Sequence, residues 1–206
     1  MPGVAAPFAV QLGDTRIGLD APPGFADTGF TGSPRLQELA EALTSASNRV
    51  LLFAVSDGDL RRFTQGDSLE LQRFMIVVTP RGMERERVSE STFKLFVNES
   101  LRGLGEAPAD RDYPRHLDAR PLGAMSLLAE LRKEADVVSV LQGTRTKEGG
   151  RSARPQYMLA SSTLLFLRGK ALSLTVYSRY QDGADVEWIQ LITARWVDDL
   201  KRLNPR

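Results

Sequence analysis

The sequence contains no cysteine and a single histidine, His116. Without cysteine the chain forms no disulfide, thiolate metal site or iron–sulfur cluster, and it has no cysteine nucleophile. One histidine excludes multi-histidine metal centres and gives histidine-based catalysis little support. We therefore expect neither a metal nor another cofactor.

Long apolar runs and an excess of one charge are also missing. No run approaches the roughly 18 apolar residues of a membrane span, and Met1 to Pro7 lack the basic and apolar regions of a signal peptide. We expect a cytoplasmic protein, or a periplasmic one if a signal peptide has been removed. The net charge is +1, so no overall field attracts nucleic acid or an anionic membrane.

What the sequence does contain is an ordinary globular composition. It has 206 residues, of which 42% are hydrophobic and 26% charged, enough to bury a full core. We predict a single domain over residues 1–206. The segment 106–121 holds three prolines and many charges, and we interpret it as a surface loop inside that domain.

Apolar patterning predicts the elements of the first two thirds. The runs 50–55 and 74–78 are apolar throughout, which is typical of strands covered on both faces. Ser33-Pro34 and Ser89 are helix-start signals. The spacing of apolar residues over 122–135 predicts a further helix, with Leu128 and Leu131 facing inward.

The last third has the clearest pattern. Strands are expected at 137–141, 157–167 and 172–180, with a basic loop over 143–155, a tight turn at Gly169-Lys170 and a final helix from about 184 to 203. Asp182 is its expected N-cap, and Asn204-Pro205 ends it. With two short strands near residues 8–19, the whole order predicts an α+β fold: an antiparallel β-sheet covered by helices on both faces.

A resemblance adds to this prediction. The segment 17–25 ends in Pro22-Pro23-Gly24-Phe25, and 157–203 reads as a hairpin followed by a long helix. This pattern resembles the PsbP-like superfamily, which includes the Ran-binding nuclear-import factor and DcrB-like proteins. The resemblance implies the same α/β/α sandwich and a non-catalytic binding or assembly role. It implies no catalytic residues.

Two features are candidate binding residues. Four cations surround Gly149-Gly150 and would suit a phosphate or an acidic partner. The spacing is not that of a P-loop, and the alternative interpretation, a solvated hairpin loop, is the more common origin of such a cluster. Trp188 is offset from the inward stripe of the last helix and is a candidate partner anchor, whereas Trp196 is expected in the core. The four cations are Arg145, Lys147, Arg151 and Arg154.

Two groups of carboxylates suggest chemistry less strongly. Asp57, Asp59 and Asp67 have no calcium-loop spacing, and we interpret them as a turn between strands. Asp110, Asp112 and Asp118 flank His116, but arginines intervene, which favours a solvated loop over a general base or metal site. The hydroxyls of residues 161–163 lack a nucleophile elbow.

The sequence therefore predicts a non-catalytic module that binds another protein, with nucleic acid excluded as a partner and the oligomeric state left open. One alternative is a hydrolase that uses arginines with Asp57, Asp59 or Asp112 in a deep pocket. The other is a structural subunit that self-associates through an exposed strand edge, at 8–12 or at the strand that begins at Val137.

Overall fold

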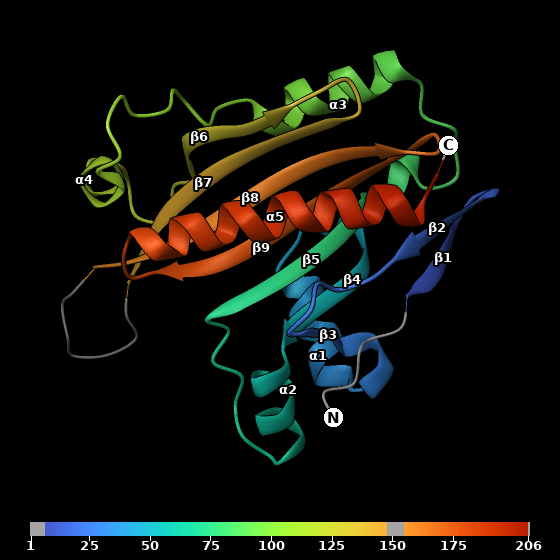
Figure 1. Ribbon diagram of the computed structural model, residues 1–206, viewed down its shortest axis with the longest axis horizontal. Coiled ribbons are helices and arrows are strands. Elements are labelled where there is room, and N and C mark those ends of the chain that lie inside the picture. Colours follow the sequence, from blue (N-terminus) through green and yellow to red (C-terminus); the bar gives the residue numbers. More distant parts are fainter. Residues whose placement is uncertain (1–6, 148–154, 206) are drawn as a thin grey trace.

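The computed structural model describes residues 7–147 and 155–205. Its main feature is a seven-stranded antiparallel sheet in the order β3-β4-β5-β9-β8-β7-β6, beside a separate β1-β2 hairpin (Figure 1). The strands are β1 Phe8–Leu12, β2 Thr15–Leu19, β3 Phe25–Asp27, β4 Asn48–Ser56, β5 Arg73–Pro80, β6 Ser126–Lys133, β7 Val137–Lys147, β8 Pro155–Leu167 and β9 Lys170–Tyr180.

Helices cover both faces of this sheet, as the sequence predicts. On one face α5 packs on β8 and β9, with the β1-β2 hairpin at its carboxyl end. On the other face α1 packs on β4, and Phe93 of α3 stacks on Phe166 of β8. The helices are α1 Pro34–Ala42, α2 Asp57–Thr64, α3 Glu90–Leu101, α4 Tyr113–Asp118 and α5 Gly183–Leu203, with short 3-10 helices η1 Thr28–Thr31 and η2 Arg81–Met83.

The longest helix, α5, is held at both ends by polar contacts. Trp196 is 1% exposed, and its indole N–H donates to the Asp20 backbone oxygen at 2.7 Å. The Asn204 amide bonds both the N–H and the carbonyl of Gly18 at 2.8 Å. The predicted core position of Trp196 and the helix end at Asn204 are thus confirmed.

The turn Pro22-Pro23-Gly24-Phe25 sets the entry to the main sheet. Phe25 N–H donates to the Pro22 carbonyl at 3.1 Å, and Gly24 has φ of 88°. Proline at the second position and a left-handed glycine at the third define a type II turn. The turn delivers Phe25 to the first residue of β3.

The predicted helix over 122–135 is wrong, because this segment forms the edge strand β6. The register of β6 on β7 shifts twice, so Leu128 and Leu131 are extra, bulged residues. Each bulge adds one residue between successive inward-facing side chains, so their spacing increases from two residues to three. The resulting three-residue spacing imitates the period of a helix.

Three further predictions from the sequence differ from the structure. The strand that begins at Val137 lies between β6 and β8, so it is internal and offers no edge for self-association. The expected turn after β4 contains α2, and the loop 106–121 contains α4. The expected loop at 143–147 continues β7, because these residues pair with β8 from Gly143 opposite Leu159 to Lys147 opposite Pro155. Gly143 also lets α4 approach, since a Cβ there would lie 2.9 Å from Leu117 Cδ1.

The hairpin turn lies one residue earlier than the sequence suggests. Arg168 and Gly169 have φ of 49° and 77°, as a type I′ turn requires. Lys170 therefore starts β9 with its side chain 1% exposed. Its ammonium donates to the carbonyls of Glu84 and Glu86 at 3.3 and 2.7 Å, fixing the segment that leads to α3.

We predict that Lys170→Met lowers the free energy of unfolding by about 1–3 kcal/mol, because two carbonyls lose a buried charged donor. Urea denaturation followed by circular dichroism measures the change. Lys94→Met, at an exposed position of α3, is the control and should change stability by less than about 0.5 kcal/mol. Equal losses in both variants would contradict the role assigned to Lys170.

Candidate functional site

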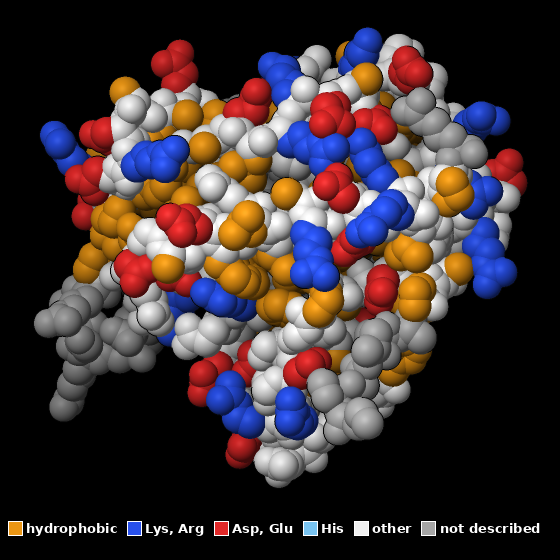
Figure 2. Space-filling view, in the orientation of Figure 1, with side chains coloured by type: hydrophobic (Ala, Val, Ile, Leu, Met, Phe, Trp, Pro, Cys, Tyr) orange, Lys and Arg blue, Asp and Glu red, His pale blue; other side chains and the backbone are white. Residues whose placement is uncertain are grey.

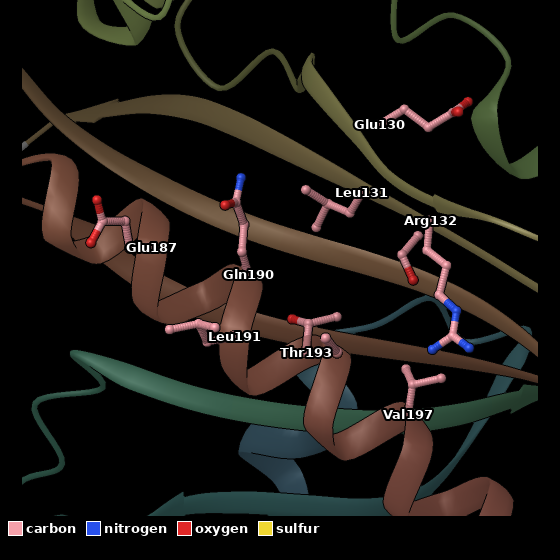
Figure 3. A pocket seen from close by; sticks show the side chains of 10 residues that line it. Glu130, Leu131, Arg132, Glu187, Gln190, Leu191, Thr193 and Val197 are labelled. Atoms are coloured by element: carbon pink, nitrogen blue, oxygen red, sulfur yellow. The ribbon is translucent and has the colours of Figure 1, made fainter.

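A groove of about 530 Å³ runs between α5 and the edge strand β6. Figure 3 shows Leu131 and Arg132 on the strand side and Gln190 on the helix side. Ten residues line the groove: Glu130, Leu131, Arg132, Ser139, Glu187, Gln190, Leu191, Thr193, Ala194 and Val197. Apolar side chains from both elements therefore meet in one open depression.

The groove exists because α5 covers only part of its face of the sheet. The helix packs on β8 and β9, and β7 and β6 extend beyond it. Beneath the helix, Ser161 and Thr193 hydroxyls lie 2.5 Å apart, and those of Ser139 and Thr163 lie 2.8 Å apart. These buried hydroxyls satisfy one another, so residues 161–163 have a structural role here.

The helix side of the groove has an exposed apolar centre with a carboxylate toward each end. Leu191 is 73% exposed, and Ala194 is exposed one turn further on. Glu187 precedes them by one turn and Asp198 follows them. Figure 2 shows exposed hydrophobic side chains among charged ones on this face of the molecule.

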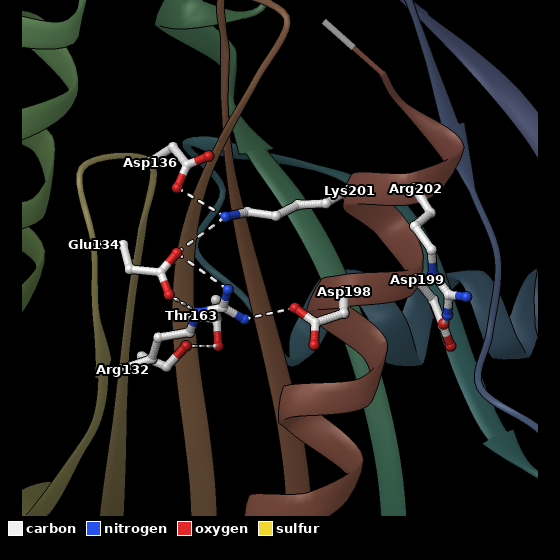
Figure 4. Close-up of polar contacts among 9 residues, drawn as sticks. Arg132, Glu134, Asp136, Thr163, Asp198, Asp199, Lys201 and Arg202 are labelled. Carbon is white, nitrogen blue, oxygen red and sulfur yellow. Dashed lines mark hydrogen bonds and ion pairs between the residues drawn. The ribbon is translucent and has the colours of Figure 1, made fainter.

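An ion-pair network closes the end of the groove near the carboxyl end of α5 (Figure 4). Arg132 bridges the two elements, with bonds of 2.7 Å to both Glu134 and Asp198. Lys201 joins Glu134 at 3.3 Å and Asp136 at 2.8 Å. The hydrogen bond from Arg132, helped by Lys201, lowers the pKa of Glu134, which favours the charged form of this carboxylate.

The amino end of α5 is fixed by a second set of contacts. Asp182 and Asp185 form a capping box, and Asp185 accepts a bond from Arg73 at 2.8 Å. Burial alone would raise the pKa of Asp185, but hydrogen bonds from Arg73, Gln181 and Asp182 lower it overall. The predicted cap at Asp182 is confirmed.

Trp188, a candidate anchor in the sequence, lies beside this cap. Its ring is half-buried, with the Phe25 ring centroid 6.1 Å away. The Arg73 guanidinium lies over the indole at 4.0 Å, a cation–π contact. The exposed part of the ring borders the amino end of α5.

Two of the four cationic candidates, Arg145 and Lys147, lie near the carboxyl end of β7. Arg145 is on β7 and bonds Asp118 at 3.4 Å and the Arg120 carbonyl at 3.2 Å. Lys147 is the last residue of β7. Arg151 and Arg154 lie outside the described residues. Tyr157 also reaches Asp118, through its hydroxyl at 2.9 Å, so the Arg145 guanidinium belongs to an internal network.

Two of the acidic candidates have structural roles at helix starts: Asp59 bonds the N-cap residue Ser56 of α2, and Asp112 is itself the N-cap of α4. The Asp59 side chain is 3% exposed and bonds Arg62 at 2.6 Å, and the Ser56 hydroxyl donates to it at 3.1 Å. Asp112 caps α4 by accepting the Arg115 N–H. In the described part of the chain, no three His, Asp or Glu residues are grouped to hold a metal ion. No helix within the described ranges is long and apolar enough to cross a membrane.

Sequence reasoning missed the groove itself. One available signal was Leu191, a large apolar residue outside the inward stripe of the last helix. The strand wall of the groove has no such signal, because the spacing of apolar residues over 122–135 predicts a helix. Only the pairing of β6 with β7 places this segment at the edge of the sheet.

No protein family and no curated protein matches the sequence. Among solved structures, the chain is similar to the Saccharomyces cerevisiae Ran-binding protein Mog1p, at 11% identity and a TM-score of 0.43, covering 96% of this chain and 94% of that one. A mutant of protein Mog1 gives 12% identity, a TM-score of 0.42 and the same coverage. This level of likeness carries no conclusion about activity, and membership of the PsbP-like superfamily stays a prediction.

We predict that Arg132 and Asp198 couple β6 to α5 weakly. A double-mutant cycle with Arg132→Met and Asp198→Asn should give a coupling of about 0.2–1 kcal/mol, because both groups are partly solvated. The coupling should shrink in 1 M salt, where the screening length is roughly 3 Å. The exposed pair Arg102 and Glu99 on α3 is the reference. A coupling of zero at low salt would show that this contact does not hold the groove end together.

We also predict that Asp185→Ala lowers the free energy of unfolding by about 1–2 kcal/mol through loss of the cap. The pKa of Asp185 is lowered in the folded state, so its contribution is present above the unfolded value of about 3.9 and disappears as pH falls through the folded pKa. Urea denaturation between pH 6 and pH 3 should therefore show that the free energy of unfolding decreases less with falling pH for Asp185→Asn than for the parent protein. Parallel pH profiles would contradict this assignment.

Proposed function

We propose that this protein is a non-catalytic module that binds another protein through the groove between α5 and β6. One observation carries the proposal: Leu191, 73% exposed, stands on the rim of an open groove whose opposite wall presents Leu131. Large apolar side chains that line a concave surface are typical of interaction sites. Solvent exposure of such a surface costs free energy that a partner would recover.

The ion-pair network supports the same function. Arg132, Glu134 and Lys201 tie the wall of the groove to α5, so the groove is formed before a partner arrives. Pre-formed sites lose less conformational entropy on binding. The surface proposed from the sequence, made of Arg145, Lys147, Arg151, Arg154 and Trp188, stays a prediction for a second contact region.

The hydrolase alternative has less support. Asp59 is held by Ser56 and Arg62, Asp112 is the N-cap of α4, and Asp57 lies in the first turn of α2. None of these three carboxylates lines the groove beside α5. The arrangement of the described residues therefore favours binding over acid–base chemistry.

A cross-linked pull-down tests the proposal with matched leucine variants. Tagged parent, Leu191→Glu and Leu95→Glu proteins are used as bait in lysate of the source organism and compared by mass spectrometry. Leu95 is 65% exposed on α3, on the other face of the sheet, so its variant controls for added surface charge.

We expect a partner that the parent and Leu95→Glu both capture and that Leu191→Glu loses. The reason is that a carboxylate at Leu191 would have to be buried without a counter-charge. Capture of the same proteins in equal amounts by all three baits would overturn the groove as the binding surface.

A further inference from the structure

The width of sheet that α5 leaves uncovered matches one helix. The helix lies over β8 and β9, and β7 and β6 are the next two strands outward. On this face α4 covers β7 near Gly143, where Leu117 packs, and the residues that line the groove come from β6, β7 and α5. Strands are about 4.8 Å apart, so the centre of the β7-β6 pair lies about 10 Å from that of the β8-β9 pair. Packed helices are about 8–10 Å apart. A second helix beside α5 would therefore occupy the groove.

The edge of β6 is poorly suited to an added strand. Two bulges interrupt its pairing with β7, which twists an edge and discourages further ladder formation. The Leu127 N–H already donates to the Leu104 carbonyl at 3.0 Å. An extended peptide would find an interrupted ladder here, whereas a helix needs only the apolar walls.

The charges of the helix side select a basic partner. Among residues 7–147 and 155–205, the Glu187 side chain has no ion-pair or hydrogen-bond partner. Asp198 bonds only Arg132 and stays 57% exposed. These carboxylates are eleven residues apart on α5, about 16 Å at 1.5 Å per residue. A second copy of this chain would bring its own acidic α5 against them, which like-charge repulsion opposes.

We propose that the groove binds an amphipathic α-helix of another protein, lying alongside α5. Its apolar face, with residues at i, i+3 or i+4 and i+7, contacts Leu131, Leu191 and Ala194. Two Arg or Lys residues of the partner helix, about three turns apart and one near each end, meet Glu187 and Asp198. This helix-in-groove arrangement rests on the proposed function and adds the chemistry of the partner.

Display selection on the full chain tests the proposal without knowledge of the natural partner. One library presents randomised four-turn helices on a helical-hairpin scaffold, and the other presents unstructured peptides of equal length. Both are selected together on immobilised parent protein. We expect the helical library to dominate, with the apolar spacing above and Arg or Lys at its ends.

Binding of the enriched sequences is then measured by fluorescence anisotropy. Leu191→Glu should weaken it at least about tenfold, since a buried leucine contact is lost. Glu187→Lys should weaken it roughly three- to tenfold and reduce its salt dependence. Leu95→Glu should leave the Kd unchanged.

The outcomes separate the two proposals. If the selected binders depend on the groove but are extended or acidic, the proposal of a basic helical partner is overturned and the proposed binding function stands. Binders insensitive to Leu191→Glu, or no binders from either library, would overturn both.

Discussion

The packing of α5 on β8 and β9 governs the rest of this face of the molecule. The helix is fixed by the buried Trp196, by the capping box at Asp182 and Asp185, and by the Asn204 clamp on Gly18. Because α5 is held over two strands, it does not reach the neighbouring pair, which α4 covers near Gly143 and which the groove leaves open beside Ser139. The groove is therefore a direct consequence of where one helix sits.

The ion pairs and the apolar side chains of the groove have different roles. The network of Arg132, Glu134, Asp136 and Lys201 fixes the two walls relative to each other, and each exposed pair contributes little stability. The apolar side chains provide the area that a partner would bury.

Much of the fold was predictable because its signals are local. The apolar runs of β4 and β5, the hairpin of β8 and β9 and the caps at Ser89 and Asp182 depend on residues close in sequence. The segment that became β6 was not predictable in this way. Its two bulges give Leu128 and Leu131 a helical spacing, and only pairing with β7 identifies it as a strand.

The sequence by itself determined an α+β fold with an antiparallel sheet, the absence of thiol and multi-histidine chemistry, and the span and caps of the last helix. These follow from composition, periodicity and capping, which act over a few residues. Only the tertiary structure decided that Arg145 is held by Asp118 and that Leu131 and Leu191 face one groove. Such pairings join residues far apart in the chain, and packing alone brings them together.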